Sequence, residues 1–279
     1  MKCLRFAGTV VLASMLGSGV AQGAELQSGQ VIKVCGQAQE WPPYLFFRRE
    51  QSAKTAEVVG YSAETLKRSL ARKGLSYSID MIPWRRCMEF VKTGVYDMMT
   101  DVSTNENRDR DYLVSQPYYA MHLVYFYDKD RPKPDVQSAA DLKKFRVCGV
   151  NGYNYAPFGL VPADMDVGSQ SLTQSYQKLK LNRCDVMTER LEIALGYKFL
   201  EVADFEKQNI GVEPVPNLPL SAFHMMVSRN VSYGNELLKL LNEGIESLKK
   251  SGEATGLANK YSIPGVKPTL VPTKTNNSH

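Results

Sequence analysis

Residues 96–108 read YDMMTDVSTNENR and carry a short apolar strand directly into a polar loop. In open α/β sheets, ligands bind at the loops that follow the carboxyl ends of strands. Arg108, at the end of this stretch, offers a planar guanidinium group that suits a carboxylate. The alternative is an ordinary solvated loop, because residues 105–111 are also a charged, turn-prone run. The rest of the chain shifts the balance towards a ligand site.

Strands and helices alternate on both sides of this stretch. Before it, the apolar patterns predict strands over 31–35 and 77–82 and helices over 62–72 and 85–92. This βαβαβ order implies an α/β fold whose sheet is parallel, with right-handed crossovers. The charged, proline-rich run 128–134 is the best candidate boundary. Beyond it we predict strands over 145–150, 185–188 and 222–227, and helices within 171–181 and over 191–200 and 235–250.

The first 23 residues have the pattern of a secretory signal peptide. Lys2 and Arg5 precede an apolar run over 6–20, and Ala21-Gln22-Gly23 is a small-x-small cleavage signal. We therefore expect an exported, soluble, periplasmic protein whose mature chain begins near Ala24. The apolar run is too short and too rich in glycine and serine for a good membrane span.

Charge and motifs exclude several function classes. The formal net charge of +5 falls to +3 when Lys2 and Arg5 are removed, and no segment concentrates basic residues, so we expect no nucleic-acid partner. The chain has no Gly-x-Ser-x-Gly motif, no Walker or dinucleotide-binding glycine pattern and no histidines at metal-ligand spacing. We accordingly expect no catalytic residues, no metal and no cofactor.

Four cysteines follow the predicted signal peptide: Cys35, Cys87, Cys148 and Cys184. An even number in an exported chain favours two disulfides, for which three connectivities exist. None of the spacings matches a zinc site. We favour Cys35 with Cys87 and Cys148 with Cys184, because each pair then stays within one repeat-like unit of the fold.

Four segments together resemble a known family. They are residues 60–66, the Pro83-Trp84 pair with the helix that ends at 94–97, residues 108–119, and residues 237–261. With these segments the chain resembles the bacterial extracellular solute-binding proteins of family 3, periplasmic receptors for polar amino acids in ABC importers. The match runs in order through nearly all of the chain after the signal peptide.

The resemblance implies a two-lobed, type II periplasmic-binding-protein fold that closes on its ligand about two hinge strands. The hinge strands would be 121–127 and 223–227. Lobe one would be discontinuous, over 24–124 and 228–266, and lobe two would span 125–227. The polar tail 267–279 is expected to be flexible.

The resemblance also implies which residues bind the ligand. The carboxylate-binding arginine corresponds to Arg108, nine residues before Pro117. Asp101 departs from the small or hydroxyl residues that many relatives have there, and would either favour a cationic group on the ligand or pair with Arg108. The other positions implied in this lobe are Thr100 and Ser103, and in the second lobe Tyr153 and Asn154.

Three further positions complete the implied site. Trp41 and Trp84 would form aromatic walls, and the alternative for Trp84 is packing in the core. Glu189 corresponds to the acidic partner of the ligand's α-ammonium group if one residue is deleted. Its neighbour Arg190 could instead neutralise it.

The function expected from these features is a monomeric receptor that captures an amino acid or related zwitterion and presents it to the membrane permease of an ABC importer. Two alternatives stand beside it. One is an enzyme on the same scaffold, such as the periplasmic cyclohexadienyl dehydratases, with Asp101 or Glu189 in proton transfer. The other is an accessory or sensory protein that presents the ligand, which the sequence does not distinguish from a transport receptor.

Overall fold

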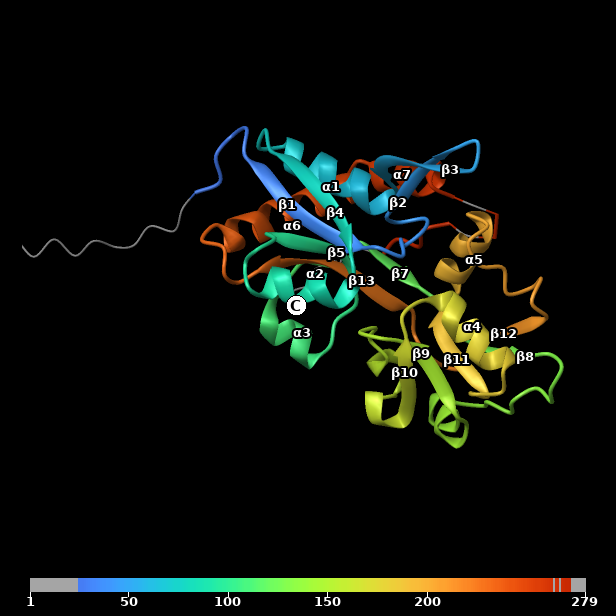
Figure 1. Cartoon of the computed structure of the whole chain (residues 1–279). Helices are drawn as coiled ribbons and strands as arrows, with labels where there is room; N and C mark the ends of the chain where they lie inside the picture. The colour runs from blue at the N-terminus through green and yellow to red at the C-terminus, as the bar shows by residue number, and fades with distance from the viewer. Residues whose placement is uncertain (1–24, 263, 266, 272–279) are drawn as a thin grey trace, which may run out of the picture.

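The computed structural model describes residues 25–262, 264–265 and 267–271. The predicted signal peptide and the last eight residues of the predicted tail lie outside these ranges. The described chain forms two lobes, each built on its own mixed β-sheet with helices packed against it (Figure 1). None of the helices in the described ranges is long and apolar enough to span a bilayer.

The sheet of the first lobe has the strand order β4-β1-β5-β13-β6, with β7 paired to β13. Its parallel strands confirm the predicted βαβαβ order, and β13 joins them antiparallel. Helices α1, α2, α3, α6 and α7 belong to this lobe, and β2 and β3 form a separate hairpin. The strands are β1 (Val31–Gln37), β2 (Phe46–Glu50), β3 (Ala53–Val59), β4 (Ser76–Ile82), β5 (Met98–Val102), β6 (Tyr112–Val114), β7 (Tyr119–Met121) and β13 (Ser221–Ser228). The helices are α1 (Tyr61–Ala71), α2 (Trp84–Lys92), α3 (Glu106–Asp111), α6 (Gly234–Lys250) and α7 (Glu253–Lys260).

The sheet of the second lobe has the strand order β10-β9-β11-β8-β12. The strands β9, β10 and β11 run parallel, β8 is antiparallel to them beside β11, and β12 at the edge is antiparallel to β8. The elements are β8 (Leu123–Asp128), β9 (Val147–Val150), β10 (Met165–Ser169), α4 (Leu172–Lys180), β11 (Val186–Arg190), α5 (Leu191–Phe199) and β12 (Ile210–Pro214), with short 3-10 helices at Ala139–Lys144, Ala156–Phe158 and Pro162–Asp164.

The chain changes lobes at two places. It leaves the first sheet at His122, between β7 and β8, and it returns between the end of β12 and the start of β13. Residues 221–227, which the predicted boundaries group with lobe two, pair within the first sheet. The two crossings lie side by side, since β7 and β13 are paired where the lobes meet.

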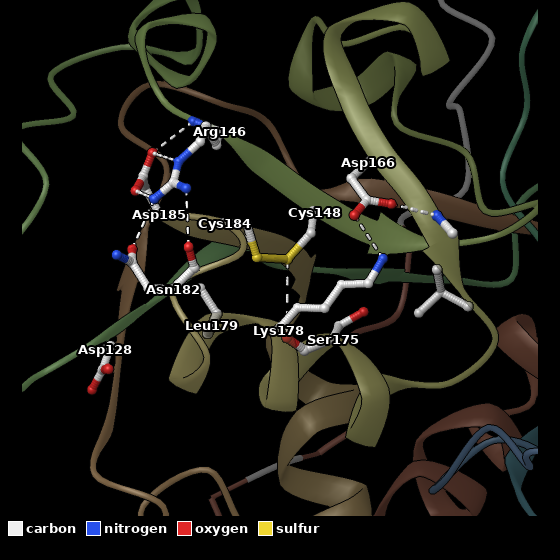
Figure 2. The surroundings of a disulfide bond; sticks show 12 residues. Asp128, Arg146, Cys148, Asp166, Ser175, Lys178, Leu179, Asn182, Cys184 and Asp185 are labelled. Atoms are coloured by element: carbon white, nitrogen blue, oxygen red, sulfur yellow. Dashed lines mark hydrogen bonds and ion pairs between the residues drawn. A yellow bond between two sulfur atoms is a disulfide. The ribbon is translucent and has the colours of Figure 1, made fainter.

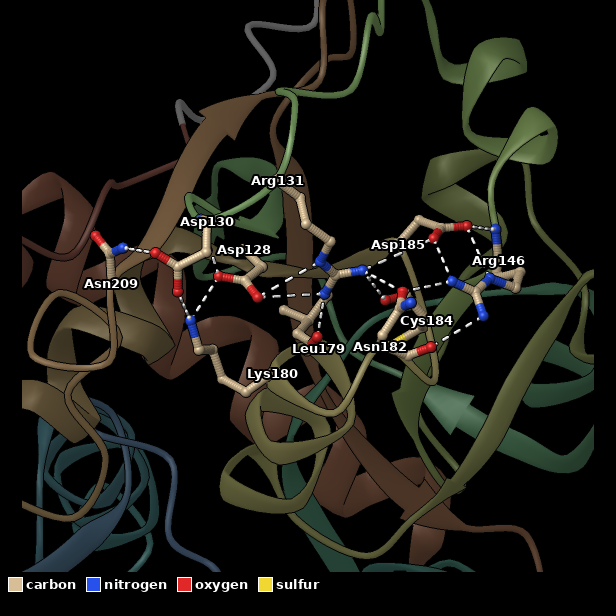
Figure 3. A network of polar contacts seen from close by, with 10 residues as sticks. All are labelled: Asp128, Asp130, Arg131, Arg146, Leu179, Lys180, Asn182, Cys184, Asp185 and Asn209. Atoms are coloured by element: carbon tan, nitrogen blue, oxygen red, sulfur yellow. Dashed lines mark hydrogen bonds and ion pairs between the residues drawn. The ribbon is translucent and has the colours of Figure 1, made fainter.

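The sequence suggested that the charged run 128–134 is a boundary between lobes, and this prediction is wrong. The run lies inside the second lobe, where ion pairs hold it against α4 (Figure 3). The Lys180 ammonium group lies 2.6 Å from a carboxylate oxygen of Asp128 and 2.6 Å from one of Asp130. Arg131 donates to the side chain of Asn182 at 2.6 Å. These contacts satisfy the charges that made the run resemble a solvated linker.

Both predicted disulfides are present. Cys35–Cys87 joins β1 to α2 in the first lobe. Cys148–Cys184 joins β9 to the turn that precedes β11 in the second lobe (Figure 2). Since each bond stays within one lobe, neither restrains motion of one lobe relative to the other.

A candidate ligand-binding cavity between the lobes

A cavity lies where the two lobes meet, and its lining comes from both. The empty space among the lining residues, including the part that is open to solvent, is about 410 Å³. Eight of the nine predicted ligand-binding residues line it: Trp41, Trp84, Thr100, Asp101, Ser103 and Arg108 from the first lobe, and Tyr153 and Asn154 from the second. The sequence did not indicate five other lining residues, which are Gly36, Gln37, Leu45, Arg190 and Phe223.

Arg108 is the central cation of the first-lobe wall. It lies in the short helix α3, whose N-cap Asn105 accepts a hydrogen bond from the Arg108 N–H at 3.0 Å. Its buried guanidinium group donates to the Ser103 carbonyl at 2.8 Å and, across the cleft, to the Gly152 carbonyl at 3.1 Å. No carboxylate in the described part of the chain lies within ion-pair distance of it. Burial and the nearby charge of Arg190 lower the pKa of Arg108 to about 10, so it remains a cation at neutral pH.

Asp101 does not pair with Arg108, and this excludes one of the two roles that the sequence suggested for it. Its backbone has a φ of 64°, and its carboxylate accepts hydrogen bonds from four hydroxyl groups. The donors are Ser62, Thr100 at 2.7 Å, Tyr118 at 3.0 Å and Tyr119 at 2.8 Å. Burial raises the pKa of Asp101, and the four donors oppose that rise. Three of these hydroxyl groups share Oδ1, and Oδ2 accepts from Thr100.

Aromatic rings form the apolar walls. Trp41 lies edge-on to Tyr153, with ring centroids 5.5 Å apart, and 6.0 Å from Phe223. Trp84 is only partly buried, and its indole N–H donates to the Gly152 carbonyl at 3.2 Å. The Arg108 guanidinium group lies 6.0 Å from the Trp84 ring centroid. Both tryptophans line the cavity, and Trp84 also packs against the apolar cluster that contains Cys35, Cys87 and Val91.

Hydrogen bonds join the lobes around the cavity, so the structure is closed. The Asn154 amide donates to the Thr104 carbonyl at 2.7 Å and to the Ser103 hydroxyl at 3.1 Å. The Tyr153 hydroxyl donates to the Gln37 side chain at 3.0 Å. Gly152, at a φ of +79°, lies so close to α2 that a Cβ there would be 2.8 Å from Arg85 Cγ.

Glu189 is the predicted site residue that the structure does not bring to the cavity. Successive residues of a strand point to opposite faces, and it is Arg190 whose side chain reaches the cavity. The Glu189 carboxylate is buried in the second lobe, 3.4 Å from an Arg190 nitrogen. Burial raises the pKa of Glu189, and the charge of Arg190 opposes this. The neutralising contact with Arg190 is thus the alternative that the structure shows.

Comparison with known proteins agrees with this architecture. The sequence model of the bacterial extracellular solute-binding proteins, family 3, matches residues 33–264. The substrate-binding protein of an amino acid ABC transporter superposes with a TM-score of 0.65 at 21% identity, covering 83% of this chain and 98% of that one. No curated protein sequence matches the chain.

Two further solved structures are similar at the level of the fold. The arginine-, lysine-, histidine-binding protein ArtJ from Geobacillus stearothermophilus gives a TM-score of 0.66 at 19% identity, covering 86% of this chain and 97% of that one. A histidine kinase sensor domain with similarity to periplasmic binding proteins gives 0.67 at 20% identity, with 86% and 98% covered. The two-lobed periplasmic-binding-protein fold is therefore shared by proteins with different roles.

Proposed function

The chain belongs to the bacterial extracellular solute-binding proteins of family 3, and we propose that it captures a small carboxylate-bearing solute between its lobes for the permease of an ABC importer. Amino acids and related zwitterions, which the sequence led us to expect, are one class of such solutes. One of the similar solved structures is an arginine-, lysine-, histidine-binding protein. The proposal places the protein in the periplasm, as a monomer with a membrane permease as its partner.

One observation carries the proposal. Arg108 is buried in the cleft and remains charged at neutral pH, and its acceptors among the described residues are all neutral. A buried cation is costly unless it is paired. A ligand carboxylate in the cleft supplies the missing counter-ion in a charge-assisted, two-pronged geometry. Because Arg108 also donates to Gly152 in the other lobe, the same group couples ligand capture to closure.

The enzyme alternative depends on Asp101, the only acid that lines the cavity in the described chain. Its raised pKa is the property that a general acid needs. Its oxygens, however, are occupied by four protein hydroxyl groups, which hold the carboxylate in place. A group bound in this way is better suited to a structural role in shaping the wall than to proton transfer.

The experiment that tests the proposal is mass spectrometry of solute released on denaturation. Protein purified without refolding should release one small carboxylate-bearing compound in near-stoichiometric amount. That compound, added back to refolded protein, should raise the melting temperature. A protein that carries no solute and shows no thermal response to small carboxylates would refute the proposal.

A further inference from the structure

Two guanidinium groups, one from each lobe, reach the cavity. Arg108 comes from the first lobe and Arg190 from the last residue of β11 in the second. Arg190 is 2% exposed, and its guanidinium carbon lies 5.7 Å from the Phe223 ring centroid. One terminal nitrogen donates to the Asn154 carbonyl at 2.8 Å, and the Nε–H is buried without an acceptor among the residues that the structure describes. An unmet donor on a buried cation indicates that an acceptor is missing from the cavity.

In the described chain the cavity offers a ligand ammonium group no acid that is free of protein donors. Asp101 is the one acid that lines it there, and four hydroxyl groups of the protein already donate to it, three to Oδ1 and one to Oδ2. Glu189 is absent from the lining, and its Oε1 accepts from the backbone N–H of Arg190 at 2.8 Å. The Gln37 side-chain oxygen, another potential acceptor, already accepts from Tyr153. An ammonium group carries three donors and would lie beside two guanidinium groups: that of Arg190, paired at 3.4 Å with the buried Glu189, and that of Arg108, which has no carboxylate within ion-pair distance in the described chain.

We propose that the solute is an organic carboxylate that carries no ammonium group, held between Arg108 and Arg190. This inference rests on the proposed function and narrows it to a class of solute. Juxtaposing like charges in a desolvated site costs several kcal/mol, so an α-amino acid is rejected although its carboxylate fits. Arg190 is the specificity-determining residue, because it is the second cation that meets the ligand when the lobes close. The rings of Trp41, Trp84 and Phe223 fit an apolar body between or beside the charged ends.

The test uses matched pairs of probes that differ only in the ammonium group. Refolded, ligand-free protein is titrated calorimetrically with L-amino acids and with the analogue of each in which hydrogen replaces the α-amino group. Examples are L-phenylalanine with 3-phenylpropionate and L-glutamate with glutarate. For the pair whose body fits, the deaminated acid should bind at least about 100-fold more tightly, the ratio that several kcal/mol implies.

The titrations with these probe pairs have three outcomes, and each bears differently on the inference and on the proposed function. An amino acid that binds as tightly as its deaminated analogue overturns the inference and leaves the proposed function intact. If neither class binds at millimolar concentration, both the inference and the proposed function fail. Tight binding confined to deaminated acids supports both.

Variants of Arg190 then test its role in selection. Arg190→Gln should reduce the preference for the deaminated acid at least about tenfold. Because this change leaves Glu189 buried without its partner, the double variant Glu189→Gln with Arg190→Gln removes both charges together. Arg183→Gln, at an exposed position in the same lobe, is the matched control and should retain the wild-type preference. An unchanged preference in the folded double variant would show that Arg190 does not set the selectivity.

Discussion

Replacing Arg108 with alanine should abolish tight solute binding without unfolding the protein. The guanidinium group donates to the Ser103 carbonyl at 2.8 Å and to Gly152 of the other lobe at 3.1 Å, and no carboxylate of the described residues lies within ion-pair distance of it. The substitution therefore removes both the counter-ion of the ligand and one bond that holds the lobes together. Neither loss affects the core of a lobe.

The magnitude follows from the burial of the pair. Truncating one partner of a buried, hydrogen-bonded charge pair costs about 2–5 kcal/mol. At about 1.4 kcal/mol per tenfold change, the affinity should fall roughly 30-fold to several-thousand-fold. The ligand-free variant should melt at or above the wild-type temperature, because a buried cation without a counter-ion is destabilising.

The assay is ligand-induced thermal stabilisation and calorimetry, with Arg110→Ala as the matched control. Arg110 lies in the same short helix, but its side chain is 69% exposed and pairs with Asp111 at 3.0 Å. Its loss should leave affinity within about twofold of wild type, since exposed pairs contribute little. Normal binding by Arg108→Ala together with a defect in Arg110→Ala would show that the orientation assigned to this helix is wrong. Normal binding by both would refute the role of Arg108.

Three other predictions follow from particular contacts. Tyr153→Phe removes the hydrogen bond to Gln37 across the cleft, so affinity should fall about 2- to 10-fold, and X-ray scattering with ligand should show more of the open form; an unchanged affinity would mean that this bond does not stabilise closure. Contacts with Lys144 and Ser138 lower the pKa of Asp141 from 3.8 to about 2. The ionised Asp141 carboxylate therefore stabilises the fold above pH 4. The melting temperature of Asp141→Asn should therefore lie below that of wild type at pH 7, and the gap should close as pH falls from 4 to 2; a gap that persists at pH 2 would contradict this. Replacing both Cys148 and Cys184 with serine opens a loop with a sequence separation of 36. The loop-entropy relation predicts that the free energy of unfolding, measured by urea denaturation, falls by about 4 kcal/mol, while the affinity for solute stays the same. A loss of affinity at unchanged stability would contradict this prediction.

Much of the fold could be read from local patterns. The strand and helix periods around residues 96–108 predicted the parallel order of β1, β4 and β5, which the structure confirms. The grouping of cysteines by repeat-like unit predicted both disulfides. The strand and helix periods are set by neighbours close in sequence, so a linear pattern records them, whereas the disulfides, with sequence separations of 52 and 36, followed from the order of the repeating units. The run 128–134 shows the limit of this reasoning, because the ion pairs that bind it to the second lobe come from α4, some fifty residues away.

The sequence by itself determined that the chain forms two α/β units, and it singled out Arg108, Trp41, Trp84 and Tyr153 of the residues that line the cavity. Tertiary structure alone decided the electrostatics of the cavity. The Asp101 carboxylate accepts hydrogen bonds from the hydroxyl groups of Ser62, Tyr118 and Tyr119, which are distant from it in sequence and come together only in the folded lobe. Whether Glu189 or Arg190 faces the ligand depends on the register of β11 against β8, in which Arg190 lies opposite Leu123. A shift of one residue reverses every side chain of a strand, so the sign of the charge presented to the ligand is fixed only when the sheet is assembled.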